Sequence, residues 1–98
     1  MIRCIRFRPY QKNTLQGFAD LHFVRTGIVI HDCCLHQKGD KRWISFPARP
    51  YDKDGKTQWA AVVEFAEDAT QAREVFQQQA VAAVLAVVDQ QKNGEAAV

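Results

Sequence analysis

Residues 28–56, IVIHDCCLHQKGDKRWISFPARPYDKDGK, are the stretch that decides the fold. Two runs of strand-forming residues flank a turn at Lys38-Gly39-Asp40, and the second run ends at Pro47. A longer loop through Asp54-Gly55 leads toward a further strand. Arg, Lys, Trp and Tyr interleave along this stretch, and that mixture on a sheet indicates a surface for nucleic acid.

Upstream of this stretch, residues 2–8 and 15–25 alternate as half-buried strands do. In the first strand we expect Ile5 and Phe7 on the buried face, and we expect Pro9 to end the strand. In the second strand Ala19, Leu21 and Phe23 are expected on one face, with Phe18, Asp20, His22 and Val24 on the other. A fifth strand is expected over residues 58–65.

Downstream, residues 68–91 contain no Gly or Pro and predict one long helix. Asp68 is the candidate cap, with Gln71 at capping-box spacing. The helical spacing of its apolar residues defines a buried face of Phe76, Ala80, Ala83, Val84 and Val87, which Ala72 extends by one turn. Because residues 80–88 are nearly all apolar, a second buried face is expected, against a partner subunit or across the sheet.

The predicted fold class is therefore α+β: an antiparallel sheet of about five strands followed by one long C-terminal helix, as a dimer. The 98 residues are expected to form a single domain over residues 1–91 with a frayed tail over residues 92–98. No apolar run approaches the roughly 18 residues of a membrane span. The first residues lack a signal-peptide pattern, and three cysteines fit reduced thiols, so a cytoplasmic protein is expected.

Charge is divided unevenly along the chain. Residues 1–59 hold eleven Lys or Arg against five Asp, a balance of +6, whereas residues 60–98 hold two basic residues against six acids, a balance of −4. The two halves together give the net +2 of the whole chain. A basic sheet half and an acidic helical half predict a sided electrostatic field.

The residues with reactive side chains form no complete catalytic or metal-binding set. His31, Cys33, Cys34 and His36 have ligand chemistry, but on a strand His31 and Cys33 would point one way and Cys34 and His36 the other. No signature of a Cys–His nucleophile flanks them, and no glycine loop could cradle a phosphate. We therefore expect no enzyme, no metal, no cofactor and no small-molecule substrate, with the cysteines as small buried thiols.

The chain resembles the SpoVG septation-regulator family. The matching residues are Ile28-Val29-Ile30-His31-Asp32, then Trp43-Ile44-Ser45-Phe46-Pro47 with Arg49, then Asp54-Gly55-Lys56, together with Gly17 and Ala19. The resemblance implies a small sheet-plus-helix fold, a homodimer, and DNA or RNA binding in bacterial regulation. Unlike the family, which carries basic residues at the start of the helix, this chain has only Arg73 among the acids there.

The residues predicted to contact nucleic acid come from the basic half: Arg6, Arg8, Lys41, Arg42 and Arg49 on phosphates, with Tyr51 stacking on a base. Trp43 is expected in the core, because it falls on the strand face opposite Arg42. Two alternatives stay open. One is a single-stranded-DNA-binding module of the transcription-coactivator type, and the other is a dimeric protein-interaction module without a nucleic-acid ligand.

Overall fold

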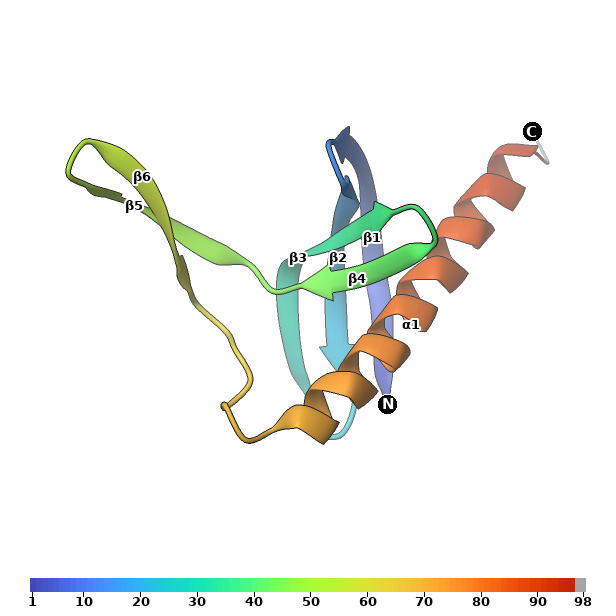
Figure 1. Ribbon diagram of the computed structural model, residues 1–98. Helices are drawn as coiled ribbons and strands as arrows, with labels where there is room; N and C mark the ends of the chain where they lie inside the picture. Colours follow the sequence, from blue (N-terminus) through green and yellow to red (C-terminus); the bar gives the residue numbers. More distant parts are fainter. Residues whose placement is uncertain (97–98) are drawn as a thin grey trace.

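The computed structural model describes the backbone of residues 1–96 and the side chains of residues 1–91. In chain order the elements are β1 (Ile2–Lys12), β2 (Leu15–Phe23), β3 (Ile28–Lys38), β4 (Lys41–Ser45), β5 (Ala48–Lys53), β6 (Lys56–Ala61) and α1 (Thr70–Ala96). The α+β class is confirmed. All strand pairs are antiparallel, but six strands form two separate sheets, ordered β1-β2-β3-β4 and β5-β6 (Figure 1).

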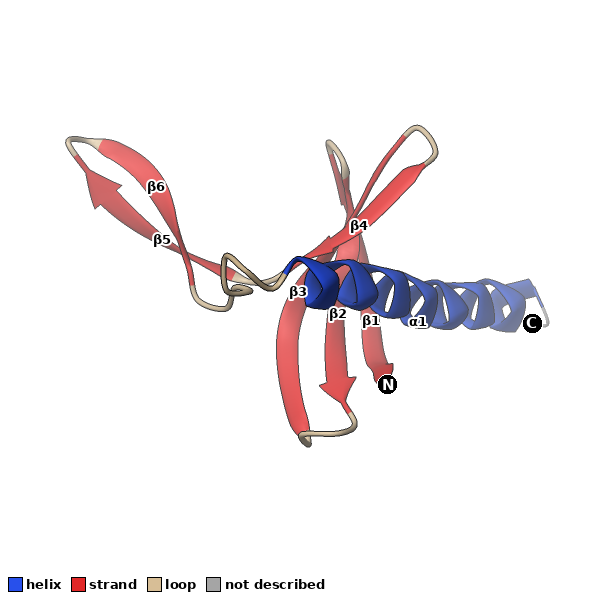
Figure 2. Cartoon of the chain, turned by 60° about the horizontal axis from the view of Figure 1, so that its bottom comes forward, coloured by secondary structure: helices blue, strands red, loops and turns tan. Residues whose placement is uncertain are grey.

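The core lies between one face of the four-stranded sheet and α1, which crosses that face (Figure 2). Period-two alternation sends Ala19 and Leu21 inward from β2, and both are completely buried. Helical spacing sends Phe76, Ala80 and Val84 inward from α1, as predicted. The cluster is completed by Phe7, Cys33, Leu35 and Ile44. Ala72 lies outside this face and is exposed.

Four phenylalanines join the start of the helix to the sheet. The Phe76 ring stacks on Phe23 with centroids 6.0 Å apart, and it meets Phe46 at 4.8 Å and Phe65 at 5.3 Å. Phe65 belongs to the segment that connects β6 to α1, so this cluster also fixes the return of the chain to the body. Aromatic pairs at these separations add about 0.5–1.5 kcal/mol each beyond their buried area.

A bulge between Cys4 and Arg6 corrects the faces predicted for β1. Cys4 and Phe7 pair with Leu21 and Ala19 and therefore share the helix-covered face, while Ile5 is the extra residue and is 54% exposed. Pro9 does not end the strand, which continues to Lys12. A proline is tolerated there because β1 is an edge strand and the missing N–H is not needed on its open side.

A second irregularity, in β3, separates His31 from Cys33. Ala19 pairs with Cys33 and Leu21 with Ile30, so two residues of β3 lie opposite Asp20 alone. Asp32 takes the left-handed conformation, with φ of 61°. Cys33 points into the core, whereas His31 is exposed and lies against Asp20, on the other face. The strict alternation predicted for this strand is therefore wrong at His31.

The helix begins at Thr70, two residues after the predicted Asp68 cap, and continues through Ala96. Most of the predicted tail is thus helical in its backbone, and residues 97 and 98 lie outside the described residues. Over the part of the chain that the structure describes, no helix combines the length and apolarity needed to cross a bilayer.

The β5–β6 hairpin, residues 48–61, stands away from the rest of the molecule (Figure 1), and we call it the arm. The sequence predicted a loop over its first half, because Pro47 and Pro50 argue against a strand. Every residue of β5 and β6 is exposed. The turn at its tip has positive φ at Asp54 (53°) and Gly55 (77°), the type I′ geometry that Asp-Gly favours.

Two glutamines of α1 bind the outer strands of the four-stranded sheet. The Gln77 amide accepts a hydrogen bond from the Ile44 N–H and donates one to the Ile44 carbonyl, both at 2.8 Å. The Gln91 amide donates to the carbonyl of Phe7 at 3.1 Å. Ile44 lies in β4 and Phe7 in β1, so the helix spans the sheet diagonally and occupies part of each edge.

Candidate nucleic-acid interface

The face of the four-stranded sheet turned away from α1 is rich in cations, and we call it the open face. Because cross-strand partners point to the same side, the register assigns residues to it. Arg3 pairs with His22, Arg8 with Phe18, and His36 with Trp43. The same register puts these basic residues on the open face: Arg3, Arg6, Arg8, Lys12, Lys38 and Lys41.

One group of side chains on this face combines a cation with aromatic rings. The Arg8 guanidinium lies 5.7 Å from the centre of the Phe18 ring, within cation–π range. Tyr10 meets Phe18 with centroids 5.8 Å apart, and Tyr10 is 53% exposed. Arg8 also forms an ion pair with Asp32, in which both side chains stay about half exposed. These contacts hold the guanidinium over the sheet, where it can still reach a ligand.

Asp20 is the only buried charged residue among those described, at 8% exposure. Its carboxylate accepts a hydrogen bond from the Asp32 backbone N–H at 3.1 Å and lies 3.2 Å from Nδ1 of His31. Burial alone would raise the pKa of Asp20, but the Asp32 amide, His31 and Arg8 outweigh it, so this pKa is lowered. The carboxylate organises the β3 irregularity, and it places negative charge beneath Arg6 and Arg8.

At the other side of the open face, His36 is held at both ring nitrogens. Nδ1 is 3.0 Å from the Thr14 hydroxyl and Nε2 is 3.2 Å from the Ser45 hydroxyl. Its ring stacks on Trp43 at 5.3 Å, tilted by 11°. Trp43 is half-buried and is not part of the core cluster, so its predicted core position is wrong. It is an aromatic ring of the open face.

The predicted contact residues fall on three different surfaces. Arg6, Arg8 and Lys41 share the open face. Arg42 pairs with Gln37 on the helix-covered side, where its Nε donates to the Gln37 side chain at 3.3 Å. It lines a cavity of about 410 Å³ together with Leu85 and Asp89. Arg42 therefore cannot share a flat surface with its neighbour Lys41.

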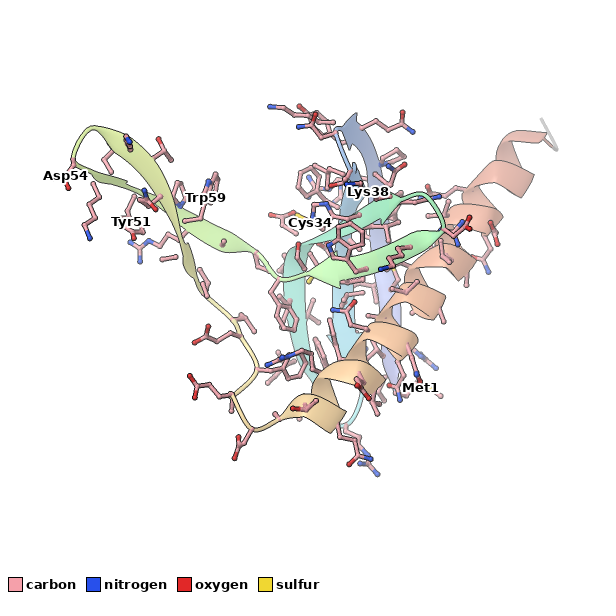
Figure 3. All side chains as sticks on the ribbon, in the orientation of Figure 1. Met1, Cys34, Lys38, Tyr51, Asp54 and Trp59 are labelled. Atoms are coloured by element: carbon pink, nitrogen blue, oxygen red, sulfur yellow. The ribbon has the colours of Figure 1, made fainter. Side chains whose placement is uncertain are left out.

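Arg49 and Tyr51 lie in β5 of the arm and not on the open face, and Figure 3 labels Tyr51 there. The arm register adds Lys53 and Lys56 to their side of the hairpin and puts Trp59 on the other. Sequence reasoning missed these three residues, although Asp54-Gly55 between two short runs is a strong hairpin signal. Given the hairpin, the register and both faces of the arm follow.

Of the three cysteines predicted as buried thiols, only Cys33 is buried, and Cys4 and Cys34 are half-buried. Burial raises the pKa of the Cys33 thiol to about 12, and burial also raises the pKa of Cys4 and Cys34. A thiol with a raised pKa is a poor nucleophile near neutral pH, because the thiolate is the reactive form. Among the described residues no three His, Cys, Asp or Glu side chains gather in an arrangement that could hold a metal ion.

Searches with protein-family models, against curated proteins and against solved structures find no match to this chain. The fold and the candidate site together define a class: a small α+β domain with an uncovered, basic and aromatic sheet face and a projecting hairpin. The likeness to the SpoVG family stays a prediction from the residues that carry it.

Proposed function

We propose that this protein binds single-stranded nucleic acid on the open face of its four-stranded sheet. The observation that carries the proposal is the sharing of one sheet face by six basic residues and three aromatic rings, those of Tyr10, Phe18 and Trp43. Cations neutralise phosphates, and rings stack on unpaired bases at about 1–3 kcal/mol per base. In a duplex the bases already stack on one another, so stacking on these side chains favours the binding of single strands over duplex.

Two carboxylates on the open face limit where a nucleic-acid strand can bind. Asp32 is paired with Arg8, and Asp20 is buried below Arg6, so a phosphate approaching Arg8 competes with Asp32. Arg3, Lys12, Lys38 and Lys41 form no ion pair with a described carboxylate, and they supply the cations at the margins. We infer that the bound nucleic acid crosses the β-strands of the sheet and that its bases stack on Phe18 and Trp43.

The role that accompanies this binding follows the SpoVG resemblance: regulation in a bacterial cytoplasm by contact with DNA or RNA. Two other readings compete with it. A single-strand-binding module of the transcription-coactivator type would share the same surface. A dimeric protein-interaction module would bind no nucleic acid, and the exposed arm favours some contact with protein.

The test is fluorescence anisotropy with labelled single-stranded DNA, duplex DNA and RNA at low and physiological salt. We expect saturable binding that weakens with salt and favours single strands. The double variant Arg6→Ala/Arg8→Ala should bind all sequences more weakly and lose about 1.4 from the log–log salt slope, since each phosphate contact on a single strand contributes about 0.7.

The matched control is Arg42→Ala, compared with the single variants Arg6→Ala and Arg8→Ala, because each removes one positive charge; Arg42→Ala acts on the helix-covered side and should leave the salt slope unchanged. An equal loss of slope in all three single variants would show that net charge alone matters and would remove the open face from the proposal. Absence of binding at low salt would leave the protein-interaction reading in its place.

A further inference from the structure

A cavity of about 410 Å³ lies between the C-terminal half of α1 and the four-stranded sheet. All four strands of that sheet contribute residues to its lining, and α1 contributes the rest. It is separate from the open face, because it lies on the side of the sheet that the helix covers. Ligand pockets in proteins have volumes of about 300–1,000 Å³, so this cavity suits a small molecule rather than a large cofactor.

The floor of the cavity is apolar. Phe7 of β1 and Leu35 of β3 reach it from the sheet, and they are 7% and 4% exposed. Leu85 and Val88, both half-buried, line it from α1. An apolar group that enters the cavity covers these side chains and removes their remaining surface from water, which favours binding.

Two opposite charges line the same cavity without meeting. The Arg42 guanidinium donates through Nε to Gln37 at 3.3 Å, and its terminal amino groups form no hydrogen bond with a described residue. The Asp89 carboxylate accepts no hydrogen bond from the described side chains. Neither residue belongs to an ion pair among the residues that the structure describes. One ligand with both charges could therefore satisfy both residues.

A hydrogen bond already fixes the helix to the sheet at this cavity. The Gln91 side chain lines it and donates from Nε2 to the carbonyl of Phe7 at 3.1 Å. Its Oε1 accepts from no donor in the described part of the chain, so it adds a second acceptor to the carboxylate of Asp89. The lining thus holds one group of donors, one group of acceptors and an apolar floor before any ligand arrives.

The geometry points to a binding site for a small zwitterion with an apolar body, either a free apolar α-amino acid or a dipeptide of such residues. Its carboxylate pairs with the Arg42 guanidinium, its ammonium group pairs with Asp89, and its side chain covers the apolar floor. A neutral apolar molecule would leave both charges without a partner in a partly closed site. A phosphate would meet the carboxylate of Asp89.

The lining holds no group suited to transform such a ligand. Among the described residues, no Cys, His, Ser, Thr or Lys side chain lines the cavity. A ligand held by charge and apolar contact alone is bound and released unchanged. The cavity therefore adds a small-molecule ligand that the sequence did not predict, and it adds no enzymatic activity.

The test is an NMR titration of the full ¹⁵N-labelled chain without nucleic acid, so that its outcome is independent of the proposed function. The probes are L-leucine and the dipeptide Leu-Leu, with leucinamide, which lacks the carboxylate, and N-acetyl-leucine, which lacks the ammonium group. We expect saturable shifts of the Leu35 and Leu85 amides with a zwitterion. Each analogue should bind about tenfold more weakly, since each loses one charged hydrogen-bonding group.

Two substitutions assign the charges to their partners. Arg42→Gln should bind the zwitterion about tenfold more weakly and lose its preference over leucinamide. Asp89→Asn should lose its preference over N-acetyl-leucine. Lys41→Gln, one residue away on the open face, and Glu74→Gln, an exposed position of α1 outside the cavity, are the matched controls and should bind like wild type.

The dipeptide and the free amino acid are distinguished by which of the two binds more tightly to wild type, and either result supports the site. Three results would overturn the proposal. They are the absence of shifts with both zwitterions at millimolar concentration, shifts confined to residues outside the cavity, and equal losses in Arg42→Gln and Lys41→Gln. The amide spectrum of each variant also reports whether it is folded.

Discussion

The body of this protein and its arm are both made of antiparallel strands, yet they are held together differently. The body buries Ala19, Leu21 and Cys33 completely and receives a helix across one face. The arm has a type I′ turn, a regular register and no buried residue. Turn chemistry and alternation are thus enough to specify a strand pair, but its stability depends on a covering layer that only the body possesses.

The largest effect that separates the two regions is expected from the phenylalanine cluster. Phe76→Ala removes a 4%-exposed ring that contacts Phe23, Phe46 and Phe65, and should lower the free energy of unfolding by about 3–5 kcal/mol. Urea unfolding followed by circular dichroism measures it. Val75→Ala, one residue away and 43% exposed, is the control and should change stability by less than about 0.5 kcal/mol.

A smaller effect comes from the same substitution made in both regions. A Cβ at Gly17 would lie 2.4 Å from a Phe7 ring carbon and 2.6 Å from the Arg8 backbone oxygen, so Gly17→Ala should destabilise the body by about 1–3 kcal/mol. At Gly55 nothing lies within 4 Å, but φ is +77°, so Gly55→Ala strains only the arm turn.

Two measurements distinguish these outcomes. Urea unfolding should shift for Gly17→Ala and stay unchanged for Gly55→Ala. Trypsin cleavage after Lys53 or Lys56 should accelerate for Gly55→Ala, because a loosened tip is easier to cut. If Gly55→Ala also shifted global unfolding, the arm and the body would be one cooperative unit and the contrast between them would fail.

The smallest effect concerns pH and the buried carboxylate of the body. The lowered pKa of Asp20 means that its contribution to stability is present above the unfolded value of about 3.9 and is lost as the pH falls below it. Asp20→Asn should therefore be less stable than wild type at neutral pH, and the difference should shrink toward pH 3. Asp52→Asn, on the arm, should show no such trend; thermal unfolding at several pH values decides.

The sequence predicted best where local pattern and tertiary packing agree. The two faces of β2 and the inward face of α1 follow from periodicity alone, because the sheet and the helix each bury one face against the other. Ala19 and Leu21 lie on the buried face of the sheet, and Ala80 and Val84 on that of the helix. The faces predicted for Ile5 and His31 were wrong, because a bulge shifts the alternation of strand faces by one residue and the position of a bulge depends on the partner strand. The single long sheet that was expected is in fact two sheets, because strand-forming residues do not specify which strand they pair with.

In the candidate site, too, the sequence predicted individual residues but not the strand pairing that brings them together. Arg6, Arg8 and Lys41 were predicted individually, but their sharing of a face with Phe18 and Trp43 depends on a register that joins three hairpins. Arg42 was grouped with Lys41 because they are adjacent in sequence, although neighbouring residues of a strand point to opposite sides. Trp43 was assigned to the core because it lies on the strand face opposite Arg42, but Ile44, the residue next to it, is the one that points into the core.

Because the Gln77 side chain of α1 accepts a hydrogen bond from the Ile44 N–H, the rate at which this amide hydrogen exchanges with solvent reports how often the helix leaves the sheet. The Ile44 hydrogen is bound by a side chain of α1 and by no strand, so solvent deuterium can replace it whenever the helix lifts off, even while the sheet stays paired. Its exchange rate, set beside that of a core amide such as Leu21, measures how often the body opens without unfolding. A helix that leaves and returns in this way would periodically uncover the β4 edge, giving the main sheet a transient version of the bare edge that the arm has permanently.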